Sequence, residues 1–151
     1  MLEHGGYVVA FLGDAVMSVW GAPLHDDQAE HNTIETMLVG KERLEAFNRD
    51  VMEGEFGLPG IGTTFGINSG VALVGNTGSD TRLNYTATGD TTNLAARLEG
   101  ANKIYDTEII AGEETARGLG ADYVIRRLDR LVARANQNRL KYMSSSAEWA
   151  R

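Results

Sequence analysis

Asn93 and Arg97 are the residues whose types and spacing most directly suggest chemistry. They are four residues apart in a stretch whose apolar residues recur at helical spacing, so both side chains would share one helix face. Asp90 is predicted to cap the start of that helix, because its carboxylate can accept hydrogen bonds from the free amides of the first turn. An amide and a guanidinium beside unpaired backbone amides suit an anion such as phosphate. The alternative is an ordinary surface helix, on which Arg97 is solvated and Asn93 only caps.

The helix that would carry these two residues follows a strand and a tight turn. Residues 83–88 are predicted as the strand, and it would carry Thr86 towards the same place as Asn93. Residues 63–75 alternate in a way that predicts a long strand, followed by a turn at 76–79 and antiparallel pairing with 83–88. The apolar face of the helix is predicted to pack on a core through Leu94, Leu98, Ala101 and Tyr105.

A β-hairpin is predicted near the start of the chain. Residues 7–12 and 15–20 are rich in β-branched and aromatic side chains, and Gly13 and Asp14 join them. Asp14 would therefore project from the tip of the hairpin or from the start of its second strand. The alternative is purely conformational, since glycine and aspartate are common turn residues.

The remaining elements are predicted to act as scaffold. Residues 26–51 read as one long helix with acidic residues at its start, and its core-facing stripe consists of Ile34, Met37, Leu38, Leu44, Phe47 and Val51. Residues 53–62 form a glycine-rich connection without either phosphate-loop motif. A strand, a short helix and a further strand follow at 108–111, 112–119 and 123–128. The three histidines have no metal-ligand spacing and are expected at the surface: His4, His25 and His31.

Length, charge and composition exclude several classes of function. A chain of 151 residues is expected to form one domain. It has no cysteine, which excludes disulfides and thiolate metal sites and accords with a reducing compartment. A net charge of −7 argues against nucleic acid as a partner. No apolar run approaches the about 20 residues that cross a membrane, so this segment is expected to make no membrane contact.

Three stretches of the chain together resemble the class III nucleotidyl cyclases of bacterial type. Residues 85–99 resemble the strand–turn–helix motif of that family, in which Tyr-Thr runs into Gly-Asp and then Asn, Ala and Arg. Residues 5–17 resemble its metal-binding hairpin, and residues 65–79 resemble the strand and glycine turn between the two. The resemblance implies an α/β fold of the α+β sandwich type, with an antiparallel-rich central sheet flanked by helices around a ferredoxin-like core. It places the catalytic domain at 1–130 and a degenerate, poorly ordered segment at 131–151.

The resemblance also implies an activity and roles for single residues. Class III cyclases convert ATP or GTP to a 3′,5′-cyclic nucleotide and pyrophosphate in intracellular signal transduction. Arg97 matches the cation that stabilises the transition state, and Asn93 matches the residue that orients the ribose. Thr86 lies where the family has a base-reading aspartate or, in one bacterial subgroup, threonine. Asp14 matches a ligand of a two-ion Mg²⁺ or Mn²⁺ site.

The family site lies between two catalytic domains packed head to tail. The resemblance therefore implies a homodimer, in which Asp14 of one subunit faces Asn93 and Arg97 of the other. It also implies a cytoplasmic location. The chain would have this location also as the cytoplasmic domain of a membrane-anchored receptor.

The chain departs from the family pattern at three places. The other metal aspartate of the family lies in a strand upstream of the first residue, so the domain is expected to be N-terminally truncated and its two-ion site incomplete. Ala10 replaces a lysine that reads the purine, which leaves ATP and GTP both open. Residues 131–136 replace a Lys-Gly-Lys turn that binds the triphosphate, with Arg134 as a substitute. One alternative is a catalytically inactive partner or fragment that binds nucleotide or dimerises without turnover, and another is a plain α/β binding or structural domain.

Overall fold

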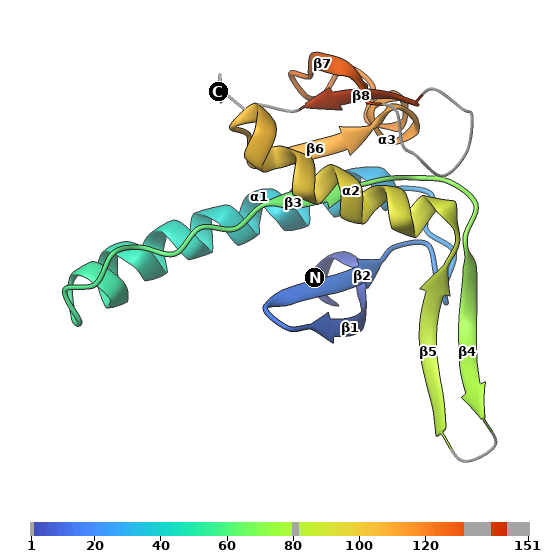
Figure 1. Cartoon of the computed structure of the whole chain (residues 1–151), viewed down its shortest axis with the longest axis horizontal. Coiled ribbons are helices and arrows are strands. Elements are labelled where there is room, and N and C mark those ends of the chain that lie inside the picture. Colours follow the sequence, from blue (N-terminus) through green and yellow to red (C-terminus); the bar gives the residue numbers. More distant parts are fainter. Residues whose placement is uncertain (1, 80–81, 132–139, 145–151) are drawn as a thin grey trace.

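The computed structural model of the chain describes residues 2–79, 82–131 and 140–144. In chain order, its elements are η1 (Leu2–His4), β1 (Tyr7–Leu12), β2 (Ala15–Val19), α1 (Ala29–Phe47), the π-helical turn η2 (Asn48–Glu53), β3 (Phe65–Ile67), β4 (Leu73–Ser79), β5 (Arg82–Thr88), α2 (Asp90–Tyr105), β6 (Ile109–Gly112), α3 (Glu113–Gly118), β7 (Arg126–Leu131) and β8 (Leu140–Ser144). This mixture of helices and small sheets confirms the predicted α+β class (Figure 1). Among the described helices, none combines the length and the apolar character that a membrane crossing requires.

A four-stranded sheet in the order β3-β6-β8-β7 forms the centre of the fold. β3 and β6 run parallel, while β8 is antiparallel to both of its neighbours, β6 and β7. Every residue of β6 is buried, which is typical of a strand that is covered on both faces. Its side chains alternate accordingly: Ile109 and Ala111 belong to the core cluster that contains residues of α1, and Ile110 belongs to the cluster that contains residues of α2.

Two separate hairpins complete the described structure. β1 pairs with β2 through a turn at Gly13–Asp14, where Gly13 has a φ of +68°. β4 pairs with β5 from Leu73↔Thr88 to Ser79↔Arg82 and projects away from the rest of the chain (Figure 1). The β1–β2 hairpin and its turn at Gly13–Asp14 are therefore as predicted. Within the described residues, β3–β6 is the one parallel pair, which agrees with the predicted antiparallel-rich architecture.

The predicted long strand at 63–75 is wrong. β3 ends at Ile67, the backbone takes a φ of +155° at Gly70, and β4 begins in a different sheet. The predicted turn at 76–79 is also wrong, because these residues continue β4 and pair with β5. Cross-strand pairing outweighs the turn preference of Asn76 and Gly78 here, as is common for strand residues whose environment decides.

The other predicted elements are present with shifted ends. α1 and η2 occupy the predicted helix at 26–51, and β6 and α3 correspond to the predicted strand at 108–111 and helix at 112–119. The strand predicted at 123–128 is β7, which begins at Arg126. Within the segment 131–151, for which no regular pattern was expected, Leu140–Ser144 form β8.

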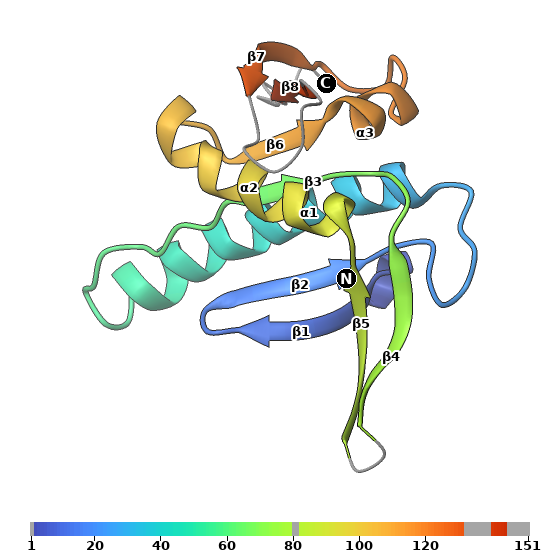
Figure 2. The ribbon, with the colours of Figure 1, turned by 45° about the vertical axis from the view of Figure 1, so that its right-hand side comes forward.

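α1 is only partly covered by the sheet. Ile34, Met37 and Leu38 are buried as predicted, but Phe47 is 42% exposed. The C-terminal half of α1 extends beyond the sheet in both views (Figures 1 and 2), which explains why the predicted stripe is not buried along its whole length.

Tyr123 connects α1 to the segment that follows α3. Its hydroxyl group donates a hydrogen bond to Oε1 of Glu35 (2.7 Å) and lies 2.9 Å from Nδ1 of His31. Burial, and then the hydrogen bond to Glu35, raise the pKa of Tyr123. His31 is therefore half-buried in a tertiary contact, whereas the exposed His25 pairs with Asp27 at the surface.

Replacement of Tyr123 by phenylalanine is expected to lower the free energy of unfolding by about 1–2 kcal/mol at neutral pH, because Glu35 loses its donor. The raised pKa means that this stabilisation is present below the unfolded pKa of about 10 and is lost as the pH rises further. Urea denaturation at pH 7 and at alkaline pH checks both statements. His25→Ala, which removes an exposed pair, serves as the control, and an equal loss in both variants would contradict the prediction.

Candidate functional site

Thr86, Asn93 and Arg97 belong to one continuous strand–turn–helix unit. β5 ends at Thr88, Gly89 forms the connection, and α2 begins at Asp90. Gly89 has a φ of +139° and a ψ of 175°, a conformation that favours glycine. The predicted unit is thus present, and it places the three residues close together along the chain.

The prediction that Asp90 caps α2 is wrong. Gly89 occupies the N-cap position, and no side chain makes a capping hydrogen bond. Asp90 is instead the first helical residue, where its negative charge still complements the helix dipole. The Thr92 hydroxyl group donates a hydrogen bond to the carbonyl oxygen of Gly89 (2.8 Å). The backbone amide of Asn93 donates to the same oxygen (3.2 Å).

Asn93 and Arg97 lie on the exposed face of α2, while Leu94 and Leu98 are buried on the other. In the part of the chain that the structure describes, neither exposed side chain takes part in a hydrogen bond or an ion pair. An unpaired guanidinium one helical turn from an unpaired amide can bind phosphate oxygens. This geometry is what the anion-binding interpretation requires.

Thr86 is half-buried in β5 and pairs with Gly75 of β4. The next residue, Ala87, is only 4% exposed, so the two side chains point to opposite faces of the hairpin. The Thr86 hydroxyl group can both donate and accept a hydrogen bond.

Asp14 lies apart from this unit. It is exposed at the turn of the β1–β2 hairpin, whereas the opposite end of that hairpin contacts β5. There, the rings of Tyr7 and Tyr85 meet edge to face with centroids 5.0 Å apart. The strand from Tyr7 to Leu12 spans about 17 Å at the usual rise per residue. Thr86, Asn93 and Arg97 therefore belong to one strand–turn–helix unit, whereas Asp14 lies at the far end of the β1–β2 hairpin.

Residues that could hold a divalent ion are few. Within the described ranges, no group of three or more histidine, cysteine, aspartate or glutamate residues could hold a metal ion. Mg²⁺ commonly binds one or two protein carboxylates together with substrate phosphates, so the carboxylate of Asp14 could serve as one such ligand. The described residues do not build a two-ion centre. Ala10 lies half-buried in β1 beside a register shift, and Arg134 lies outside the described residues.

α2 is held against the sheet by a close backbone approach at Gly66. A Cβ atom at this position would collide with the carbonyl oxygen of Ala95 and the amide nitrogen of Glu99.

The buried Asn102 adds a polar contact between α2 and the sheet, since its Nδ2 donates to the carbonyl oxygen of Phe65 (3.0 Å) and its Oδ1 accepts from Thr107 (2.9 Å). Asn102 was not predicted from the sequence, although a polar residue four positions after Leu98 on the apolar face indicates a buried polar contact.

Comparisons with known proteins agree with this geometry. The family model described as the adenylate and guanylate cyclase catalytic domain matches residues 1–145. Adenylate cyclase 1 of Rhizobium meliloti (strain 1021) is 45% identical over 108 residues, which cover 72% of this chain and 16% of that protein. An adenylate cyclase of Anabaena cylindrica is 31% identical over 134 residues, which cover 86% of this chain and 26% of that protein. The chain thus spans only a small part of these relatives.

Solved structures show the same fold. The adenylyl cyclase CyaB from P. aeruginosa superposes with a TM-score of 0.82 at 24% identity, over 99% of this chain and 77% of that one. A guanylyl cyclase superposes with a TM-score of 0.81 at 23% identity, over 94% of this chain and 70% of that one.

The close contact at Gly66 predicts a strong effect of a single methyl group. Gly66→Ala is expected to lower the free energy of unfolding by about 1–3 kcal/mol, because the backbone of α2 must move away from β3. Gly100→Ala is the matched control on the same helix: nothing lies within 4 Å of an added Cβ there, and alanine should stabilise by about 0.5–1 kcal/mol. Urea denaturation of both variants gives the comparison. A neutral or stabilising Gly66→Ala would show that α2 does not pack this closely.

Proposed function

This chain belongs to the adenylate and guanylate cyclase catalytic domain family, and from that premise we propose that it converts ATP or GTP to 3′,5′-cyclic nucleotide and pyrophosphate. The observation that carries the proposal is the unpaired Asn93 and Arg97 on the exposed opening of α2. The relatives from Rhizobium meliloti and Anabaena cylindrica are named adenylate cyclases, which supports a phosphorus–oxygen lyase acting in intracellular signal transduction. An inactive partner that contributes only Asn93 and Arg97 to a shared site would have no use for Asp14.

In the proposed reaction, the 3′-hydroxyl group of the ribose attacks the α-phosphorus, pyrophosphate leaves, and the hydroxyl proton is lost. Negative charge grows on the α-phosphate oxygens in the transition state. Arg97 supplies a positive charge for these oxygens through its guanidinium group. Asn93 orients the ribose through its amide, which offers both donors and an acceptor.

Thr86 is proposed to contact the base. Its hydroxyl group can donate or accept, so it can serve an adenine as well as a guanine edge. Ala10 adds no hydrogen-bonding group. This chemistry supports either ATP or GTP as the substrate class.

Asp14 is proposed as one ligand of Mg²⁺ or Mn²⁺. A bound divalent ion supplies charge neutralisation at the phosphates and a lower pKa for the attacking hydroxyl group. Asp14 itself provides a carboxylate at an exposed turn, free of other described partners.

We further propose that the active form is a head-to-tail homodimer in the cytoplasm. Within one chain, Asp14 lies at the turn of the β1–β2 hairpin, whereas the opposite end of this hairpin contacts Tyr85 of β5, next to Thr86, and this separation supports a site shared by two subunits. The lack of cysteine accords with a reducing compartment.

Arg97→Ala is expected to lower kcat about 100-fold or more, because the developing phosphate charge loses its cation. Cyclic nucleotide formed from ATP and from GTP with Mn²⁺ is the measurement. Arg117→Ala is the control, since Arg117 is also exposed but pairs with Glu113 and Glu114 on α3. Wild-type turnover in Arg97→Ala would overturn the proposed role.

A mixing experiment tests the shared site. Asp14→Asn and Arg97→Ala are each expected to be nearly inactive alone. Mixed in equal amounts, they should regain roughly a quarter of wild-type activity, since half of the dimers would be mixed and each would hold one intact site. A mixture no more active than its components would contradict the head-to-tail arrangement.

A further inference from the structure

The segment between β3 and β4 lies against the first turn of α2. Nδ2 of Asn68 donates a hydrogen bond to the carbonyl oxygen of Thr91 (3.2 Å). The Thr91 hydroxyl group in turn donates to the carbonyl oxygen of Val71 (2.6 Å). The two hydrogen bonds run in opposite directions, so residues 68–71 contact Thr91 through both its backbone and its side chain.

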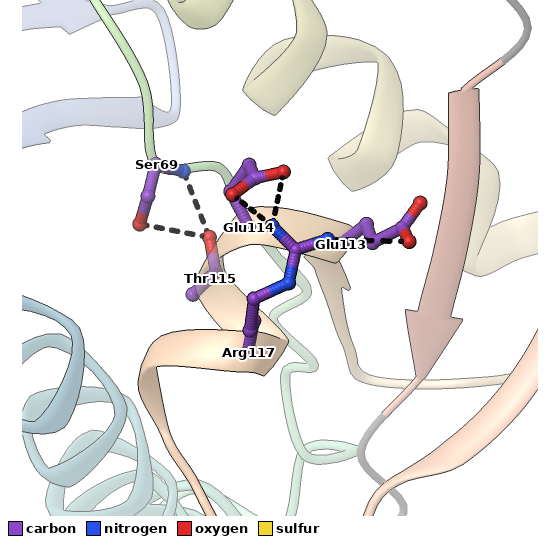
Figure 3. A network of polar contacts seen from close by, with 5 residues as sticks. All are labelled: Ser69, Glu113, Glu114, Thr115 and Arg117. Atoms are coloured by element: carbon purple, nitrogen blue, oxygen red, sulfur yellow. Dashed lines mark hydrogen bonds and ion pairs between the residues drawn. The ribbon is translucent and has the colours of Figure 1, made fainter.

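Residues 68–71 are themselves fixed to α3. The Ser69 amide donates to Oγ1 of Thr115 (2.8 Å), and the Thr115 hydroxyl group lies 3.0 Å from Oγ of Ser69 (Figure 3). Thr115 is fully buried. Asn68 also packs so closely on Gly112 that a Cβ atom there would collide with its Oδ1. Residues 68–71 therefore link α3 to the first turn of α2 through hydrogen bonds.

No side chain caps the start of α2, because its N-cap residue is a glycine. The side chains of Asn93 and Arg97 have no partners among the described residues. Leu94 is buried on the inner face, and the contacts of Thr91 with residues 68–71 add two hydrogen bonds between the first turn of α2 and the rest of the fold, which help to hold this turn at a defined angle. A catalytic group displaced by about 1 Å can lose about 100-fold in rate, so this angle matters for chemistry.

We propose that Asn68 and Thr91 are positioning residues, which orient the first turns of α2 and thereby aim Asn93 and Arg97 at the substrate. This inference rests on the proposed cyclase function. Neither residue needs to touch the nucleotide, because both act through the helix. In the sequence, Asn68 stands out only as part of the motif at residues 65–79, and Thr91 only as part of the motif at residues 85–99.

The experiment combines steady-state kinetics with hydrogen–deuterium exchange of peptides from residues 89–98. Thr91→Val removes the hydroxyl group, Thr91→Ser keeps it, and Asn68→Asp replaces the donating amide by a carboxylate of the same shape. Thr64→Val is the matched control, because it removes a threonine hydroxyl that bonds Glu99 on the same helix but further from its start.

Thr91→Val and Asn68→Asp are expected to lower kcat by about 10- to 100-fold with little change in KM, and to speed exchange at the start of α2. Thr91→Ser and Thr64→Val should resemble the wild type in both measurements. Unchanged exchange in Thr91→Val would overturn the proposal, as would a loss of kcat in Thr91→Ser or Thr64→Val as large as the loss in Thr91→Val. If the wild type itself shows no turnover, the proposed function fails, and the exchange data alone still decide whether these residues position α2.

Discussion

The packing of α2 on β3 and β6 is the interaction on which the rest of the structure depends. Leu98 and Ile110 are fully buried at this contact, and Gly66 allows the helix backbone to lie directly on β3. Because one face of α2 is buried in this way, the residues one step around the helix must face outward. The exposed stripe of Asn93 and Arg97 is thus a consequence of how the helix is packed.

Different parts of α2 are held by different kinds of contact. Apolar contacts hold α2 from Leu94 to Ala101, and the buried Asn102 adds a polar contact near its C-terminus, whereas Thr91 in its first turn makes polar contacts to residues 68–71. A helix start without a side-chain cap leaves backbone amides available near the unpaired Arg97. Both features suit the proposed binding of a highly charged triphosphate.

Much of the fold could be predicted because local patterns and tertiary packing agree. The Gly13–Asp14 hairpin, α1 and the apolar face of α2 follow from turn chemistry and helical periodicity, which act over a few residues. The long strand predicted at 63–75 was wrong because the break between β3 and β4 depends on contacts with distant residues, namely Thr91 and Thr115. β8 could not be predicted because its pairing with β6 and β7 is decided by the sheet.

By itself, the sequence determined the residue types of the site and the family resemblance, since Thr86, Asn93 and Arg97 lie within twelve consecutive positions of one motif. Only the tertiary structure decided that Gly89 and not Asp90 is the N-cap of α2, that Asn68 and Thr91 contact its first turn, and that Asp14 lies at the far end of a separate hairpin. The physical reason is range: propensity and spacing act between near neighbours in the chain, whereas these outcomes depend on hydrogen bonds and packing between residues that only folding brings together.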